Sequence, residues 1–156
     1  MKKSNAARLL ERGGYTYTLH SYPVDREDLS LSHAAKQLGV PPGMLFKTLV
    51  TLNEKHQPII AVVSGEHTLD LKALAQAAGC KKCTMLPMKE MPAVTGYVRG
   101  GCSPLGMKKL FPTFLDQVAL EYERIWISAG VRGLQLALSP HALIEVLGAK
   151  CAFLGK

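Results

Sequence analysis

Residues 46–64 read FKTLVTLNEKHQPIIAVVS and carry the strongest structural signal in the chain. Two runs rich in Val, Ile, Leu and Thr, residues 46–52 and 59–64, flank a polar segment that contains Asn53 and Pro58. β-Branched residues favour strands, whereas Asn and Pro favour turns. The stretch therefore predicts two antiparallel strands joined in a hairpin.

Around the hairpin, apolar residues recur at helical spacing and the runs end at glycines. We expect helices from Ala6 to Gly13, from a cap at Ser32 to Gly39, and over residues 70–78 and 140–147, with one helical turn over 87–93. Short apolar segments predict strands over residues 15–22, 96–99, 113–115, 123–128 and 134–138. Because this order is neither regular β-α-β nor all-β, we expect an α+β fold: a single domain over residues 1–156 with a curved mixed β-sheet, or pseudo-barrel, and packed helices.

The composition is that of a globular protein, since 47% of the 156 residues are hydrophobic and 20% are charged. No segment approaches the roughly 18 to 20 apolar residues that a membrane span requires. The basic opening, residues 1–5, is not followed by the apolar run of a secretory signal. We therefore expect a cytoplasmic protein without a membrane partner.

The formal net charge of +7 would attract polyanions, which makes nucleic acid a candidate partner. The aromatic residues are scattered and form no RRM-like signature for stacking bases. Any RNA would thus be bound through phosphates and shape. Net charge alone leaves open a basic protein that binds no RNA.

The cysteines do not complete a metal site. Cys80 and Cys83 have the two-residue spacing of half a zinc site, but Cys102 and Cys151 lack it. Cys80 also follows Gly79 at an expected helix end, whereas the reactive cysteine of a thioredoxin-like site begins a helix. We expect reduced thiols, no metal and no cofactor.

Three segments could contribute to a site. Lys47 stands at the start of a strand rich in Val and Leu, where it either extends into solvent or holds a carboxyl, phosphate or oxyanion. The loop GGCSPLG, residues 100–106, contains three glycines, so it either forms a tight turn or binds an anion with its backbone amides. The segment SAGVRG, residues 128–133, predicts a hairpin turn.

The sequence contains no recognisable protein nucleophile. No serine stands in a GxSxG motif, and no histidine stands in a known triad or metal motif. The residues thus favour a site that positions and polarises a substrate while another group attacks.

From residue 6 to 153 the chain resembles the YbaK/EbsC family, relatives of the editing domain inserted in bacterial prolyl-tRNA synthetases. Each motif is weak alone, but together they stand in the family's order and spacing: TLHSY at 18–22, FKTL at 46–49, TGY at 95–97, GGCSPLGMKK at 100–109 and SAGVRGL at 128–134.

The resemblance implies a trans-editing deacylase that removes mischarged cysteine from Cys-tRNA(Pro). Prolyl-tRNA synthetase forms this ester because cysteine is close to proline in size, and a small apolar pocket rejects such a near-isostere by only about 10- to 200-fold. In the family, the thiol of the substrate attacks its own ester to give a cyclic thiolactone and free tRNA, which agrees with the missing nucleophile. The implied partners are tRNA(Pro) and prolyl-tRNA synthetase, and not DNA.

By position, the resemblance implies Lys47 and Gly101 as catalytic residues, Lys47 as the essential lysine and Gly101 through its backbone. It implies substrate contacts for five more residues: Tyr22, Thr48, Gly100, Ser103 and Ser128. We expect the site to form at one concave edge of the sheet.

Three positions depart from the family's pattern. Ala129 and Val131 replace the usual Gly and Lys, which could alter the pocket width or the tRNA contact, and Cys102 replaces an aliphatic residue. We expect Cys102 to pack as a small hydrophobe rather than act as a nucleophile. Two other functions stay open: a deacylase for Ala-tRNA(Pro) or for several aminoacyl-tRNAs, and a noncatalytic module that binds RNA or the synthetase.

Overall fold

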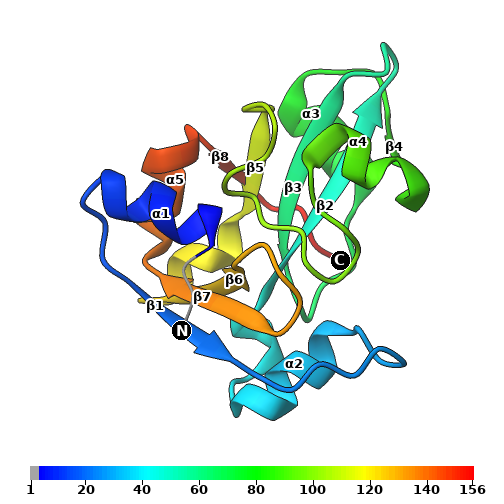
Figure 1. Cartoon of the computed structure of the whole chain (residues 1–156). Helices are drawn as coiled ribbons and strands as arrows, with labels where there is room; N and C mark the ends of the chain where they lie inside the picture. The colour runs from blue at the N-terminus through cyan, green and yellow to red at the C-terminus, as the bar shows by residue number, and fades with distance from the viewer. Residues whose placement is uncertain (1–3) are drawn as a thin grey trace.

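The computed structural model describes residues 4–156, so the first three residues of the expected domain and of its basic opening lie outside the described residues. The strands within this range form two sheets (Figure 1). One sheet is antiparallel, with the order β1–β7–β6, from Tyr17–Ser21, Leu134–Leu138 and Ile125–Ser128. The other is mixed, with the order β4–β2–β3–β5–β8, from Cys83–Met85, Phe46–Asn53, Pro58–Ser64, Thr113–Asp116 and Lys150–Ala152.

The helices lie around these sheets and are short, so their ends matter for their stability. Four of them begin at a Ser or Asp side chain that accepts a backbone N–H: α1 (Asn5–Arg12), α2 (Leu31–Leu38), α3 (Leu71–Ala78) and α5 (Pro140–Leu147). Each of these helices ends at a glycine. The shorter helices are α4 (Met91–Thr95), η1 (Pro42–Met44), η2 (Met88–Glu90) and η3 (Gln117–Glu121).

The α+β class and the hairpin are confirmed. β2 pairs antiparallel with β3, from Phe46 opposite Ser64 to Leu52 opposite Pro58. The segment 128–133 connects the antiparallel strands β6 and β7, as predicted. The two sheets meet at a parallel bridge between Leu45 and Trp126 and do not close into a barrel.

Two local predictions are wrong. Ser30, not Ser32, caps α2, because the hydroxyl of Ser30 accepts the N–H of His33 at 3.2 Å and the helix begins at Leu31. Residues 96–99 form no strand. Gly96 and Gly100 have φ angles of 86° and 81°, which lie outside the range of a strand, and the Gly101 N–H donates to the Val98 carbonyl in a turn.

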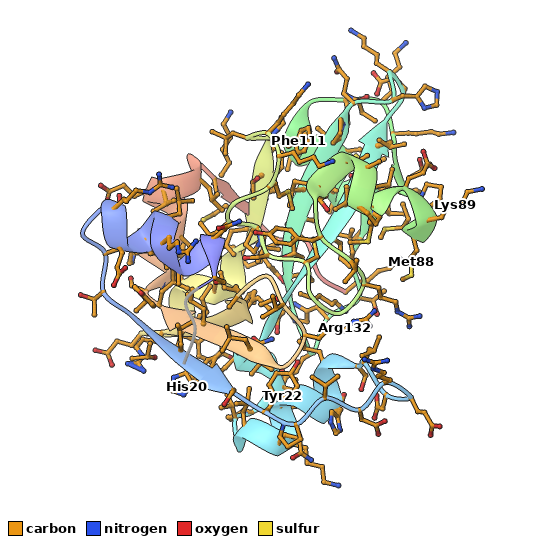
Figure 2. The ribbon with its side chains drawn as sticks, viewed as in Figure 1. His20, Tyr22, Met88, Lys89, Phe111 and Arg132 are labelled. Carbon is orange, nitrogen blue, oxygen red and sulfur yellow. The ribbon has the colours of Figure 1, made fainter. Side chains whose placement is uncertain are left out.

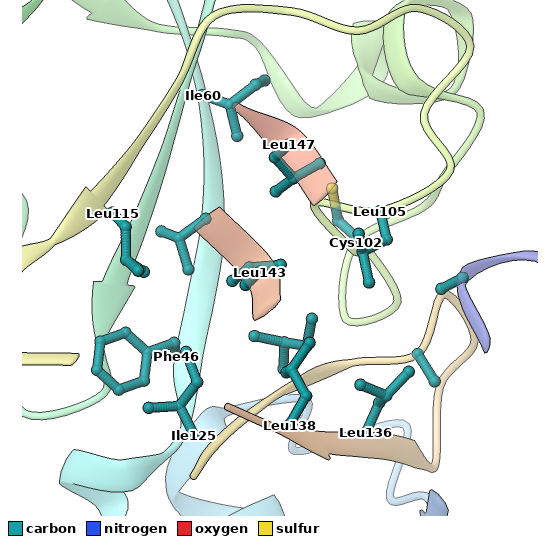
Figure 3. Close-up of a cluster of buried hydrophobic side chains, with 14 of the residues drawn as sticks. Phe46, Ile60, Cys102, Leu105, Leu115, Ile125, Leu136, Leu138, Leu143 and Leu147 are labelled. Atoms are coloured by element: carbon teal, nitrogen blue, oxygen red, sulfur yellow. The ribbon is translucent and has the colours of Figure 1, made fainter. Parts of the chain in front are cut away.

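The main core lies between the two sheets (Figure 3). Its fully or almost fully buried side chains come from both sheets and from α1 and α5, and include Phe46, Leu115, Ile125, Leu138 and Leu143. Cys102 and Leu105 extend from the loop 100–106 into the same core. Since each buried large apolar side chain contributes about 1.5 to 3 kcal/mol, these contacts fix the loop against both sheets.

Candidate functional site

A cavity of about 310 Å³ lies where the two sheets separate. β2 and β6 approach each other at the bridge between Leu45 and Trp126, and the described chain shows no further bridge between them. The start of β2, residues 46–49, and the end of β6, Ser128, lie on either side of this fork and both line the cavity. Side chains from α2, from the loop that contains Gly100 and from residues 88–91 complete its wall.

Five of the predicted site residues line this cavity: Tyr22, Lys47, Thr48, Gly100 and Ser128. Gly101 and Ser103 lie behind the lining. The Gly101 N–H donates to the Val98 carbonyl at 3.0 Å, and the fully buried hydroxyl of Ser103 accepts the N–H of Leu105 at 3.2 Å. Both residues therefore hold the loop in shape, and the catalytic contact assigned to Gly101 stays a prediction.

Lys47 is the second residue of β2 and is half-buried. Burial lowers its pKa below the ordinary value of 10.5, because removing water disfavours the ammonium. Within residues 4–156, no carboxylate forms an ion pair with it. Lys47 thus contributes a cation to the cavity that no internal anion neutralises.

Thr48 lies on an open edge of β2. The neighbouring strand β4 pairs only with residues 51–53, so residues 46–49 have no strand partner on that side in the mixed sheet. The N–H of Leu86 donates to the Val50 carbonyl, and backbone groups of alternate residues in a strand point the same way. The N–H of Thr48 consequently points away from β3 and toward the open edge.

Two buried polar atoms in the cavity wall have no hydrogen-bond partner within the described chain: Oγ1 of Thr48 and Oε1 of Gln135. Thr48 is 9% exposed and Gln135 is 3% exposed. Gln135 lies on β7, directly opposite Ser128 of β6. Since buried polar atoms in proteins nearly always find a partner, these two atoms are candidates for hydrogen bonds to a polar ligand.

Gln135 is a candidate residue that the sequence analysis missed. Its strand reads LQLAL, in which glutamine is the one polar residue among apolar ones. A buried strand that contains a single amide is a signal for a ligand contact, because an amide inside a core needs a partner.

Hydrogen bonds among residues that precede and follow Gly100 in the sequence hold its loop in place. The hydroxyl of Tyr97 donates to the Leu105 carbonyl at 2.6 Å, and Oγ1 of Thr95 accepts the N–H of Tyr97 at 3.0 Å. Tyr22 is fixed through its backbone, since its N–H donates to the Gly133 carbonyl at 2.9 Å. The Ser128 hydroxyl accepts the N–H of Gly130 at 3.1 Å.

Among the described residues that line the cavity there is no histidine and no carboxylate. Asp28 lies beside one lining hydroxyl, that of Ser30, which caps α2 by accepting the N–H of His33 at 3.2 Å. Cys102 lines the cavity but packs into the main core, as expected, and burial raises its pKa to about 12. Its thiol therefore stays protonated near neutral pH.

Elsewhere in the described chain, the Sγ atoms of Cys80 and Cys83 lie 3.6 Å apart. No group of three or more His, Cys, Asp or Glu side chains between residues 4 and 156 could hold a metal ion. None of the helices in that range is long and apolar enough to cross a membrane.

Comparison with known proteins identifies the class to which this fold and cavity belong. Residues 27–146 match the family model of the aminoacyl-tRNA editing domain. EbsC of Enterococcus faecalis, named as a candidate Cys-tRNA(Pro)/Cys-tRNA(Cys) deacylase, is 44% identical over 151 residues, which cover 97% of this chain and 92% of EbsC. The chain therefore belongs to the aminoacyl-tRNA editing domain family, and the resemblance seen in the sequence is confirmed.

Two further similarities concern proline. A proline–tRNA ligase of Geotalea daltonii is 31% identical over 97 residues, which cover 58% of this chain and 17% of the ligase. A crystal structure described as a candidate trans-editing enzyme for prolyl-tRNA synthetase has a TM-score of 0.84 and 27% identity, and the match covers 99% of both chains. The structural match covers the whole fold, whereas the match to the ligase relates only part of this chain to a synthetase.

Proposed function

We propose that this chain acts as one domain over residues 1–156 in the cytoplasm and, without a cofactor, removes mischarged cysteine from Cys-tRNA(Pro). The similarity to EbsC supports the substrate, and the similarity to part of a proline–tRNA ligase supports prolyl-tRNA synthetase as a partner. One observation carries the proposal: Lys47 lines the same cavity as Thr48 and Gln135, whose buried side-chain oxygens have no partner in residues 4–156, and no histidine or carboxylate of that range lines it.

In this proposal the substrate supplies the nucleophile. The sulfur of the bound cysteine attacks the carbonyl carbon of its own ester, so that a C–S bond forms and the C–O bond to the ribose breaks. The proton that leaves the thiol ends on the ribose oxygen, and the products are a cyclic thiolactone and free tRNA. Because a thiol of pKa near 8.5 is only a few per cent thiolate at neutral pH, the site must favour the thiolate or the oxyanion.

Lys47 and Thr48 are the residues that do so. The Lys47 ammonium favours both negative charges, and its half-buried position weakens the competition from water. The N–H of Thr48, at the open edge of β2, donates to the developing oxyanion. Removing one donor of this kind typically lowers the rate by about 10² to 10³.

The remaining polar atoms hold the amino acid. Oε1 of Gln135 and Oγ1 of Thr48 accept hydrogen bonds from the α-ammonium of cysteine, which gives each buried atom the partner that it lacks. Tyr22, Gly100 and Ser128 shape the rest of the contact surface. Ser103 and Gly101 keep the loop in position.

The experiment compares the release of cysteine and of alanine from tRNA(Pro) by the wild type, by Lys47→Ala and by Lys55→Ala. Lys55 is a matched control, because it is an exposed lysine in the turn at the other end of β2. We expect rapid release of cysteine alone, a loss of about 10² or more in Lys47→Ala and full activity in Lys55→Ala.

Each other result selects a different function. Equal release of both amino acids would indicate a deacylase with broad specificity, because alanine has no thiol. Binding of tRNA(Pro) without release would indicate a noncatalytic module. Full activity in Lys47→Ala would refute the role of the lysine.

A further inference from the structure

Two arginines lie at the mouth of the cavity. Arg99 lines the cavity, and Arg132 lines a small hollow beside it together with Tyr22 and Gly100. Figure 2 shows Arg132 between Tyr22 and Met88, which both belong to the cavity wall. Both arginine side chains are exposed. The opening through which an ester would enter is therefore flanked by positive charge.

The position of these arginines is built into the fold. Nε of Arg132 donates to the Arg99 carbonyl at 2.8 Å, which joins the two loops. A Cβ atom on Gly101 would lie 3.2 Å from the backbone N of Arg132, so only glycine allows the loops to approach this closely without a shift. The two guanidinium groups are thus held on neighbouring, connected loops.

Neither guanidinium is neutralised. Between residues 4 and 156, no carboxylate lies within ion-pair distance of Arg99 or Arg132. Asp25 and Asp28 line the same hollow as Arg132, but their carboxylates accept backbone N–H groups of their own loop, from Glu27 at 3.0 Å and Ser30 at 3.1 Å. These acids would repel a polyanion and direct it toward the side of Arg99.

Exposed apolar side chains alternate with the arginines. Val98 and Val131 are each 50% exposed and stand next to Arg99 and Arg132 in the sequence, and Met88 on the cavity wall is 57% exposed. Single-stranded RNA presents the same alternation, with phosphates that pair with guanidinium groups and base faces that stack on apolar and guanidinium surfaces.

We propose that this arginine rim, formed by Met88, Val98, Arg99, Val131 and Arg132, binds the single-stranded 3′ end of the aminoacylated RNA. This inference rests on the proposed function. The ester lies on the terminal ribose, so when its carbonyl is inside the cavity the nearest phosphates lie outside, at the rim. Arg99 and Arg132 bind these phosphates, and the apolar side chains contact the terminal bases without reading their sequence.

The test separates contact with RNA from contact with the ester. Arg99→Gln is the main variant, because the Arg99 side chain makes no internal hydrogen bond or ion pair within residues 4–156, and Lys55→Gln is the control with the same change in charge. The kcat/KM of each is measured on Cys-tRNA(Pro) and on cysteine methyl ester. We expect Arg99→Gln to lose on the order of tenfold on the tRNA only, and the slope of log kcat/KM against log salt to fall by about one.

The outcomes are distinct. An equal loss with the methyl ester, an equal loss in Lys55→Gln, or no loss on tRNA would each overturn the rim. Arg132→Lys should retain part of the tRNA activity, because it keeps the charge, while Arg132→Gln should lose as much as Arg99→Gln.

Binding of an RNA oligonucleotide that ends in CCA tests the rim without the chemistry. We expect fluorescence titration to show weaker binding by Arg99→Gln than by Lys55→Gln. If the protein bound this RNA through Arg99 but released no amino acid, the proposed function would fail while the rim would stand. If cysteine were released but binding did not depend on Arg99, only the rim would fail.

Discussion

Asp116 and Gln135 are buried to nearly the same degree, with 1% and 3% of the residue exposed. Within the described chain, both carboxylate oxygens of Asp116 have hydrogen-bond partners, whereas the side-chain oxygen of Gln135 has none. The Asp116 carboxylate contacts Nδ1 of His67 at 2.9 Å and accepts the N–H of Leu154 at 3.4 Å. The side-chain oxygens of Gln135 and Thr48 are buried without a partner in the described chain, and both residues line the cavity. Polar burial thus supports the fold at Asp116 and leaves binding capacity for a ligand at Gln135.

Within this comparison of two buried polar groups, the largest effects on activity are expected from removing the unpartnered atoms. Gln135→Leu and Thr48→Val should each lower kcat/KM on Cys-tRNA(Pro) by roughly ten- to a hundredfold, because each removes a hydrogen bond to a charged group of the substrate. The same changes should keep or raise the free energy of unfolding, by up to about 1 kcal/mol, since each removes a buried polar atom without a partner.

Steady-state kinetics and urea unfolding on the same samples measure both effects. Gln76→Leu, on the exposed face of α3, is the control for a general change from glutamine to leucine. Normal kcat/KM in Gln135→Leu would show that the cavity does not hold the amino acid where we place it.

Asp116→Ala should give the opposite pattern. Loss of the carboxylate leaves the N–H of Leu154 and Nδ1 of His67 without their acceptor, which should lower the free energy of unfolding by about 1 to 3 kcal/mol. The kcat/KM of the folded protein should stay close to that of the wild type. Urea denaturation and kinetics check this, and a fall in kcat/KM as large as that of Gln135→Leu would erase the distinction between the two sites.

The same contrast shows what a sequence can predict. The hairpin of β2 and β3 and the helices that end at Gly39, Gly79 and Gly148 were predictable, because turn residues and apolar spacing are local signals. The three-residue strands β4 and β8 were not predicted. Strands this short form only because a neighbouring strand pairs with them.

The site divides in the same way. Tyr22, Lys47, Thr48, Gly100 and Ser128 could be placed together from the resemblance to a family. The missing partner of Oε1 of Gln135 depends on the fork between the two sheets. Residues 96–99 look like a strand in the sequence, but Gly96 and the following Gly100 have positive φ. Such properties arise from tertiary contacts that no local pattern encodes.

A smaller effect concerns pH. The rate should rise with pH as the substrate thiol, of pKa near 8.5, ionises, and should fall once Lys47 loses its proton. Because burial lowers the pKa of Lys47, this fall should occur below pH 10.5. The profile of kcat/KM against pH, corrected for spontaneous hydrolysis, measures it. Lys47→Arg keeps its charge, so an unchanged falling limb in that variant would show that another group titrates.

The smallest effect is expected for Cys102→Ser. The thiol lines the cavity but stays protonated, so its replacement should leave kcat/KM near the wild-type value and cost only a little stability. Inactivation of a variant that remains folded, as judged by circular dichroism, would assign chemistry to a residue that we place in the core.

The most direct test of the account compares the release of cysteine and of serine from the same tRNA(Pro). The two esters differ in one atom, so both fit the cavity, but only cysteine has a sulfur that can attack its own carbonyl. We predict that the wild type releases cysteine faster by about 10² or more. Equal rates for the two esters would contradict it, because the nucleophile would then come from water or from the protein.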